Sequence, residues 1–223
     1  TKLKIQNKIR QYFYSDKEEK INILSHGFGL ILSIIGFVFL LLRALENGNP
    51  IYIFSLTVFG LSLILLYTAS TLYHGTQEPV VRNRYRMLDM AAIYVLIAGS
   101  YTPYALVILK GTEGWKLFGI IWSIAFIGII WKIFTTGRYN VISTLAYLFM
   151  GYLCLFYINP LLAKLPYEGL IWLLSGGAAY TIGVFFYAMD DKIPYNHAIW
   201  HACVLFGSFS HFISIFFYVL PSS

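Results

Sequence analysis

The sequence predicts an all-α polytopic membrane protein, a bundle of seven transmembrane helices with a cytoplasmic N-terminus and an extracytoplasmic C-terminus. Of its 223 residues, 58% are hydrophobic and only 12% are charged, a composition far more apolar than that of a soluble globular domain. The charged residues are confined to short gaps between long apolar runs. Lysine and arginine are concentrated in alternate gaps, which is the pattern that sets orientation in a membrane.

Apolar runs long enough to cross a bilayer take up most of the chain. A spanning helix needs roughly 20 mostly apolar residues. Six uncharged runs have this length, and a seventh run, 117–131, is shorter. Lys116 and Lys132 bracket this shorter run, and their aliphatic stems can extend toward the interface. The chain therefore divides into a basic tail over 1–20 and a seven-helix transmembrane domain over 21–220. The six uncharged runs of spanning length are 21–42, 51–73, 90–109, 141–163, 169–189 and 195–220.

The positive charges give the predicted orientation. Twelve of the 16 lysines and arginines lie in the tail or in the second, fourth and sixth gaps, and the other four lie on the opposite side. The richer side is expected to be cytoplasmic. This distribution accounts for the net charge of +6 without a nucleic-acid partner, and membrane lipids are the expected partners. The tail 1–20 fits either a helix on the anionic inner leaflet or a solvated segment that only sets topology.

Few ionisable residues lie in or beside the predicted helices, and each is costly to bury in a bilayer without a partner. With the predicted orientation, four helix ends bring polar side chains to one cytoplasmic depth. These side chains come from parts of the sequence that are far apart, so their common depth indicates a shared site. They are Glu19, Asn22, His26, Ser70, His74, Asp89, His197 and His201.

The spacing of the histidines predicts a metal site. His197 and His201 are four residues apart, so on a helix they share one face about 6 Å apart along the axis, and together they can bind one metal ion. His74 supplies a third imidazole, and Ser70, one turn before it, can hydrogen-bond toward it. Three neutral imidazoles with one position left for water are typical of a catalytic zinc ion, and Asp89 would hold or deprotonate that water.

Other polar residues near this depth could belong to the same site. Glu19, Asn22 and His26 follow an i, i+3, i+7 pattern and share a helix face. His211 lies roughly 15 Å further along the last helix and is excluded from the site. A His-x-x-x-His pair also arises by chance, and histidines at helix ends often hydrogen-bond to water or carbonyls. The common depth of His74 and the scarcity of other ionisable groups favour the metal site.

Three motifs of the chain resemble those of the hemolysin III family, the bacterial branch of the progestin and adipoQ receptor family. The resemblance covers about 19–219, and the segment 99–103, Gly-Ser-Tyr-Thr-Pro, is also similar to the third helix of that family. The motifs are Glu19-x-x-Asn22-x-x-x-His26, Ser70-x-x-x-His74 followed by Asp89, and His197-x-x-x-His201 with His211 beyond it.

The resemblance implies a seven-helix, receptor-like fold in the bacterial plasma membrane, with a cytoplasmic N-terminus and a bound zinc ion (Zn²⁺). Some relatives hydrolyse the amide of ceramide, eukaryotic members respond to hormones, and lytic activity is ascribed to one branch. By motif, the zinc ligands would be His74, His197 and His201, the residues lining the metal-bound water would be Asp89 and Ser70, and the supporting polar residues would be Glu19, Asn22 and His26.

Three classes of function are therefore expected. The first is a zinc-dependent hydrolase of a lipid amide or ester, ceramidase-like, at the cytoplasmic leaflet, with Asp89 as general base. The second is a non-enzymatic sensor or regulator of membrane state with a structural zinc ion. The third, a cytolytic pore, would need polar residues across the whole bilayer, and the predicted helices 117–131, 141–163 and 169–189 carry almost none. The hydrolase has the better chemical rationale.

Overall fold

Helices account for every regular element in the computed structural model, which describes residues 14–135, 140–189 and 193–220. Within these ranges seven helical stretches are long and apolar enough to cross a membrane, which confirms the predicted all-α fold with seven spanning helices. They are α2 (Asp16–Asn47), α3 (Pro50–Gly75), α4 (Pro79–Pro103) with the π-helical turn η1 (Tyr104–Leu109), α5 (Gly111–Thr135), α6 (Asn140–Tyr152) with the 3₁₀ turn η2 (Leu153–Tyr157) and α7 (Ile158–Lys164), α8 (Tyr167–Ala188), and α9 (Asn196–Ser214) with the π-helical turn η3 (Ile215–Val219).

The first helix begins earlier than the apolar pattern predicts. The Ser15 side chain accepts a hydrogen bond from the backbone N–H of Glu18, so α2 starts at Asp16. Residues 16–20, which the prediction assigned to the tail, are therefore part of the first spanning helix. Residues 1–13 of the predicted tail lie outside the described residues.

Local sequence also determines the short connection between α2 and α3. Gly48 ends α2 in the left-handed conformation, with a φ of 73°, and its N–H donates to Ala44 O. The Asn49 side chain then accepts from the N–H of Ile51 and caps α3, whose first residue is Pro50. The first two helices are thus joined by a tight turn.

The second loop, between α3 and α4, ends in another side-chain cap. The carboxylate of Glu78 accepts from the backbone N–H groups of Val80 and Val81 at the start of α4. These bonds favour the charged form and lower the pKa of Glu78 below its usual range. α4 therefore begins at Pro79, well before the apolar run predicted for this helix.

The fourth span differs from its prediction in length and in the position of one lysine. α5 extends the run 117–131 at both ends, so its length is ordinary for a spanning helix. Lys116 is exposed and pairs with Glu113, as expected for a residue near the interface. Lys132 does not extend toward the interface: it is fully buried, and its Nζ donates to Ser143 Oγ on α6 at 3.0 Å.

The fifth span is broken, although the sequence predicted one continuous helix over 141–163. At η2 the backbone departs from α-helical hydrogen bonding. The Tyr101 hydroxyl from α4 donates to Gly151 O at 2.7 Å and accepts from the N–H of Cys154 at 2.8 Å. A helix can break inside a membrane only where its freed backbone groups find partners, and Tyr101 supplies them.

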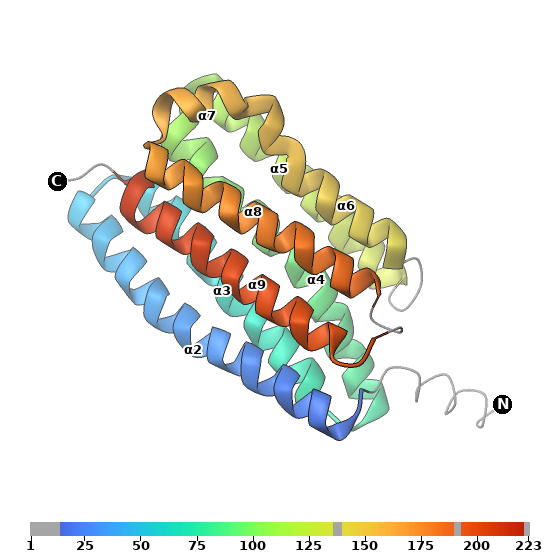
Figure 1. Cartoon of the computed structure of the whole chain (residues 1–223). Coiled ribbons are helices and arrows are strands. Elements are labelled where there is room, and N and C mark those ends of the chain that lie inside the picture. Colours follow the sequence, from blue (N-terminus) through green and yellow to red (C-terminus); the bar gives the residue numbers. More distant parts are fainter. Residues whose placement is uncertain (1–13, 136–139, 190–192, 221–223) are drawn as a thin grey trace.

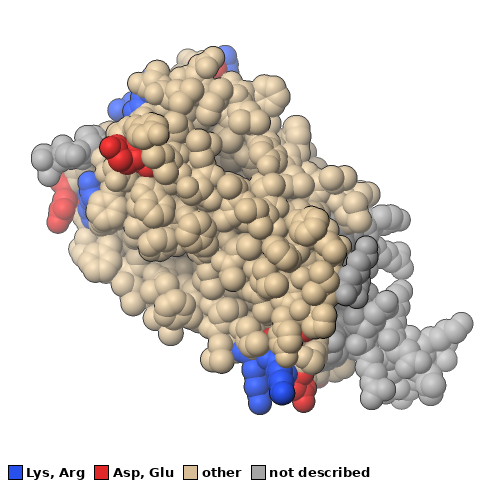
Figure 2. Space-filling model, viewed as in Figure 1, with Lys and Arg blue, Asp and Glu red and all other residues tan. Residues whose placement is uncertain are grey.

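The arrangement of the helices brings the ends of α2, α3, α4 and α9 together. α2 packs against α3 and α9, α3 against α4, and α8 against α9 (Figure 1). Figure 2 shows charged side chains at the two ends of the visible face and an uncharged band between them. Large apolar side chains are exposed on the spanning helices, including Phe134 at 82% exposure and Phe156 at 80%. Such surfaces require a bilayer around them, so the chain is a multi-pass membrane protein.

Candidate metal centre

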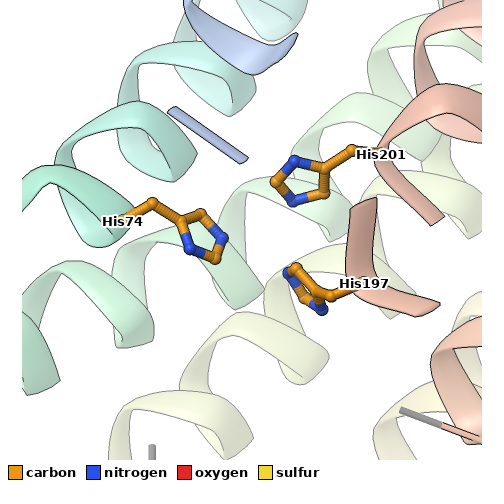
Figure 3. Close-up of side chains that lie close together, drawn as sticks. All are labelled: His74, His197 and His201. Atoms are coloured by element: carbon orange, nitrogen blue, oxygen red, sulfur yellow. The ribbon is translucent and has the colours of Figure 1, made fainter. Parts of the chain in front are cut away.

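Three buried histidines form a cluster at one end of the bundle, which we call the histidine end. His74 lies in the last turn of α3, and His197 and His201 lie in the first turns of α9. One ring nitrogen from each lies within 4.8 Å of those of the other two. Figure 3 shows the three rings turned toward a common space. This histidine cluster can hold a metal ion.

The Nδ1 atom of each of the three histidines lies close to a polar side chain. His74 Nδ1 lies 2.8 Å from Glu19 Oε2, and His201 Nδ1 lies 3.1 Å from Ser25 Oγ. His197 Nδ1 lies 2.8 Å from the hydroxyl of Tyr14. Histidines that bind metals are usually oriented by an oxygen acceptor on the other nitrogen, most often a carboxylate, a backbone carbonyl or water, and the Glu19 carboxylate takes this part at His74.

One further observation supports the fit. Nε2 of His74 is buried and has no hydrogen-bond partner within the described part of the chain. A buried imidazole nitrogen without a partner is costly, and a metal ion would remove that cost. Three neutral imidazoles are a donor set that zinc prefers. The residues therefore fit a zinc ion.

A buried ion pair orients the carboxylate that holds His74. The guanidinium of Arg82, on α4, pairs with Glu19. The same guanidinium donates to three backbone carbonyls at the end of α3, among them that of Tyr73 at 3.0 Å. Arg82 is only 2% exposed. It therefore links α2, α3 and α4 around the cluster.

Sequence reasoning counted Arg82 only as a charge that sets topology, and it missed Tyr14 and Ser25. A signal for Arg82 was present, because a carboxylate predicted inside an apolar bundle requires a nearby positive charge. Glu19 was predicted as a supporting residue of unclear role, and its position beside His74 now gives it one.

A fourth histidine stacks against the cluster. The ring of His26, on α2, lies parallel to that of His201, with centroids 3.5 Å apart. Its Nδ1 lies 2.7 Å from Ser70 Oγ. The predicted bond from Ser70 toward His74 is therefore wrong: the rotation of α2 places His26 within reach of the hydroxyl instead. Asn22, one turn before His26, is fully buried, and its backbone oxygen accepts from Ser25 Oγ.

A cavity of about 540 Å³ adjoins the cluster. His26, Ser70, Asp89 and His201 line it at the histidine end, and mostly apolar side chains line the rest. The Asp89 carboxylate lies close enough to Ser70 to interact with its hydroxyl. Asp89 does not begin its helix as predicted, because α4 starts at Pro79 and places it further along the axis.

The cavity also reaches the outer surface of the bundle. Among its lining residues are Tyr152 on α6 and Ile182 on α8, which are 47% and 55% exposed. The cavity therefore extends from the histidine end to the surface between these two helices. That surface faces the hydrocarbon region of a bilayer.

Comparisons with known proteins agree with the motifs. A family model described as "Haemolysin-III related" matches residues 14–212. The chain belongs to the hemolysin III family. "Hemolysin-3" of Bacillus cereus is 45% identical over 207 residues, which cover 93% of this chain and 94% of that protein. The "Hemolysin-3 homolog" of Bacillus subtilis (strain 168) is 44% identical, over 92% of this chain and 96% of that protein.

A more distant similarity reaches beyond bacteria. The human "Monocyte to macrophage differentiation factor" is 28% identical over 213 residues, which cover 92% of this hemolysin III chain and 86% of that protein. The predicted family is thus confirmed. Within it, the geometry groups the predicted residues in two sets: Glu19, His74, His197 and His201 meet in the cluster, whereas His26, Ser70 and Asp89 face the adjoining cavity.

Proposed function

We propose that this chain is a zinc-dependent hydrolase of a lipid amide or ester, acting at the cytoplasmic leaflet of a bacterial plasma membrane. One observation carries the proposal: the histidine cluster adjoins a largely apolar cavity that Asp89 and Ser70 also line. The cavity suits an acyl chain, and the cluster lies where the polar end of such a chain would be. The cytoplasmic orientation rests on the distribution of lysine and arginine.

The histidines would hold the metal. His74, His197 and His201 would be its ligands, and zinc bound there would supply a Lewis acid that polarises a carbonyl and activates water. Glu19 accepts a hydrogen bond from Nδ1–H of His74 and so leaves the lone pair of His74 Nε2 available for the metal ion. Arg82 pairs with Glu19 and holds its carboxyl group in place.

The other residues would position the substrate and move protons. The acyl chain enters between α6 and α8 and is held by the apolar lining, which excludes water from it. Asp89 accepts a proton from the attacking water as the C–O bond forms, and then donates it to the leaving nitrogen or oxygen as the scissile bond breaks. Ser70 positions the Asp89 carboxylate. The products are a fatty acid and an amine or alcohol.

A second function, a membrane-state sensor with a structural zinc ion, is favoured by a different observation. The histidine cluster and its partners join four helices, with Glu19 from α2, His74 from α3, Arg82 from α4 and His201 from α9. A metal ion there would couple the positions of these helices. The third alternative, a cytolytic pore, is less well supported because the cavity lining is mostly apolar.

Turnover by purified protein separates the hydrolase from the sensor. Zinc-loaded protein in nanodiscs is incubated with a panel of ceramides, other N-acyl amides and esters, and fatty-acid release is measured by mass spectrometry. The hydrolase predicts release that Asp89→Asn reduces by about 10²-fold or more with unchanged zinc content. Glu113→Gln, which changes an exposed carboxylate paired with Lys116, is the matched control and should keep full activity. Full zinc loading without release across the panel would contradict the hydrolase.

A further inference from the structure

A second group of polar side chains lies in the cavity, far from the histidine cluster. His211 and Tyr180 line the cavity, as does Tyr104 of η1. His211 is ten residues beyond His201 on the same helix, which places it about 15 Å further along the axis. The cluster and the proposed reaction use none of these three side chains.

Two glycines fix the rings of His211 and Tyr180. A Cβ at Gly176, on α8, would lie 2.2 Å from Cδ2 of His211, and a Cβ at Gly207, on α9, would lie 2.8 Å from the ring of Tyr180. Each ring therefore packs where the opposite helix has no side chain. The two rings meet edge to face, with centroids 5.4 Å apart. Their positions are set by backbone packing, as in a preformed binding site.

The hydrogen bonds of His211 determine what it can recognise. Its Nε2 lies 3.2 Å from the carbonyl oxygen of Leu173, so Nε2 carries the proton and donates. Nδ1 is then an acceptor, and it has no hydrogen-bond partner among the described residues. Only a group with an O–H or N–H can satisfy it.

Tyr104 provides the complementary group at the same end of the cavity. η1 packs against η3, which continues α9 beyond His211. Tyr104 is 4% exposed, and its hydroxyl makes no hydrogen bond of normal geometry within the described ranges. Its nearest polar neighbour is Ser214, three residues beyond His211 on α9, whose own hydroxyl donates to Gly169 O. In an apolar interior an unmade hydrogen bond is costly, so an acceptor and a donor that line one cavity without making a hydrogen bond indicate a polar ligand group.

We propose that His211 and Tyr104 form a polar subsite for a hydroxyl group on the chain of a lipid whose head lies at the histidine cluster. The hydroxyl donates to Nδ1 of His211 and its oxygen accepts from Tyr104. A hydroxyl fits better than a carbonyl, which has no proton for Nδ1, and better than a charged group, which the apolar surroundings would exclude. The subsite rests on the lipid-binding part of the proposed function and selects hydroxylated chains.

Binding of fatty acids tests the subsite without requiring hydrolysis. Dodecanoate, tetradecanoate and a series of their monohydroxylated forms, with the hydroxyl at successive chain positions, compete with a fluorescent fatty acid for zinc-loaded protein. In wild type, the form whose hydroxyl reaches the subsite should bind more tightly than the plain chain. This ratio of affinities should be about 3- to 10-fold larger in wild type than in His211→Leu. A preference that is the same in both proteins at every position overturns the subsite and leaves only a buried water there.

Two more variants control for packing. Tyr104→Phe removes only a hydroxyl and should lower the same preference, even if His211→Leu disturbs the contact with Gly176. Ser210→Ala removes a fully buried hydroxyl on α9 that does not line the cavity, and it should leave the preference unchanged. Failure of wild type to bind any fatty acid overturns the lipid-binding function and the subsite together, whereas binding without hydroxyl preference overturns the subsite alone.

Discussion

The third and fifth spans differ sharply in how deeply they are buried in the bundle. In its most apolar window, the span Pro79–Leu109 is 72% buried inside the protein, whereas the span Val141–Lys164 is only 17% buried. The first carries Arg82 and Asp89 and is enclosed by its neighbours. The second, with its break at η2, faces outward and forms part of the outer wall of the cavity. The molecule thus combines an enclosed polar site with a wall that faces outward.

This contrast has a physical basis in the two environments. Buried polar groups at the histidine end hold one another in fixed positions, and removing one leaves its partner without compensation. A side chain on the outer wall that loses contact with its protein neighbours can contact lipid tails instead, and lipid tails are as apolar as those neighbours. Changes at the histidine end should therefore cost more than changes at the wall.

The largest loss of stability is expected for Arg82→Met. The change removes the partner of Glu19 and leaves a buried carboxylate beside His74, at a cost of about 3–5 kcal/mol. The melting temperature in nanodiscs should fall strongly, and the additional change Glu19→Gln should restore part of the loss because no charge is then left unpaired. Arg84→Met, at an exposed position of α4, is the control and should change stability by less than about 0.5 kcal/mol. Equal effects of the two arginine variants would contradict the buried ion pair.

A smaller loss is expected for the double variant His197→Ala, His201→Ala. Zinc that binds only the folded state stabilises it by about 2.7 kcal/mol at 100 times the dissociation constant, and the variant should lose this term. Wild type should melt at a higher temperature with zinc than without, and the double variant should show no difference. Metal analysis should find zinc only in wild type and in His211→Leu, whose side chain lies outside the cluster. Zinc retained by the double variant would show that the metal binds elsewhere.

The parts of the molecule that the sequence predicted well are those that the bilayer dictates. Every spanning helix must be a long apolar run, so the seven spans followed from hydropathy. The fixed period of a helix likewise predicted that His197 and His201 share a face, and that Glu19 and His26 do.

The parts that were missed depend on how each helix is rotated about its axis, which hydropathy does not determine. The rotation of α2 decides that Ser70 bonds to His26 rather than His74. The packing of α4 decides that Arg82 lies inside the bundle rather than at its surface. The break at η2 was missed for a related reason, because it is stabilised by Tyr101 from another helix.

The smallest of the three effects is expected for Tyr101→Phe, which tests the link between the buried and the exposed spans. Loss of the hydroxyl leaves Gly151 O and the N–H of Cys154 without their partner, at a cost of about 1–3 kcal/mol. The lower part of this range is expected, because α6 lies at the periphery and can recover some of its helical hydrogen bonding. Amide hydrogen exchange should rise at residues 151–157 and stay unchanged in α3 and α9, whereas Tyr167→Phe, a change at an exposed tyrosine of α8, should affect neither. If exchange rose equally at the histidine end, the wall and the polar site would behave as one rigid unit, and the distinction between them would fail.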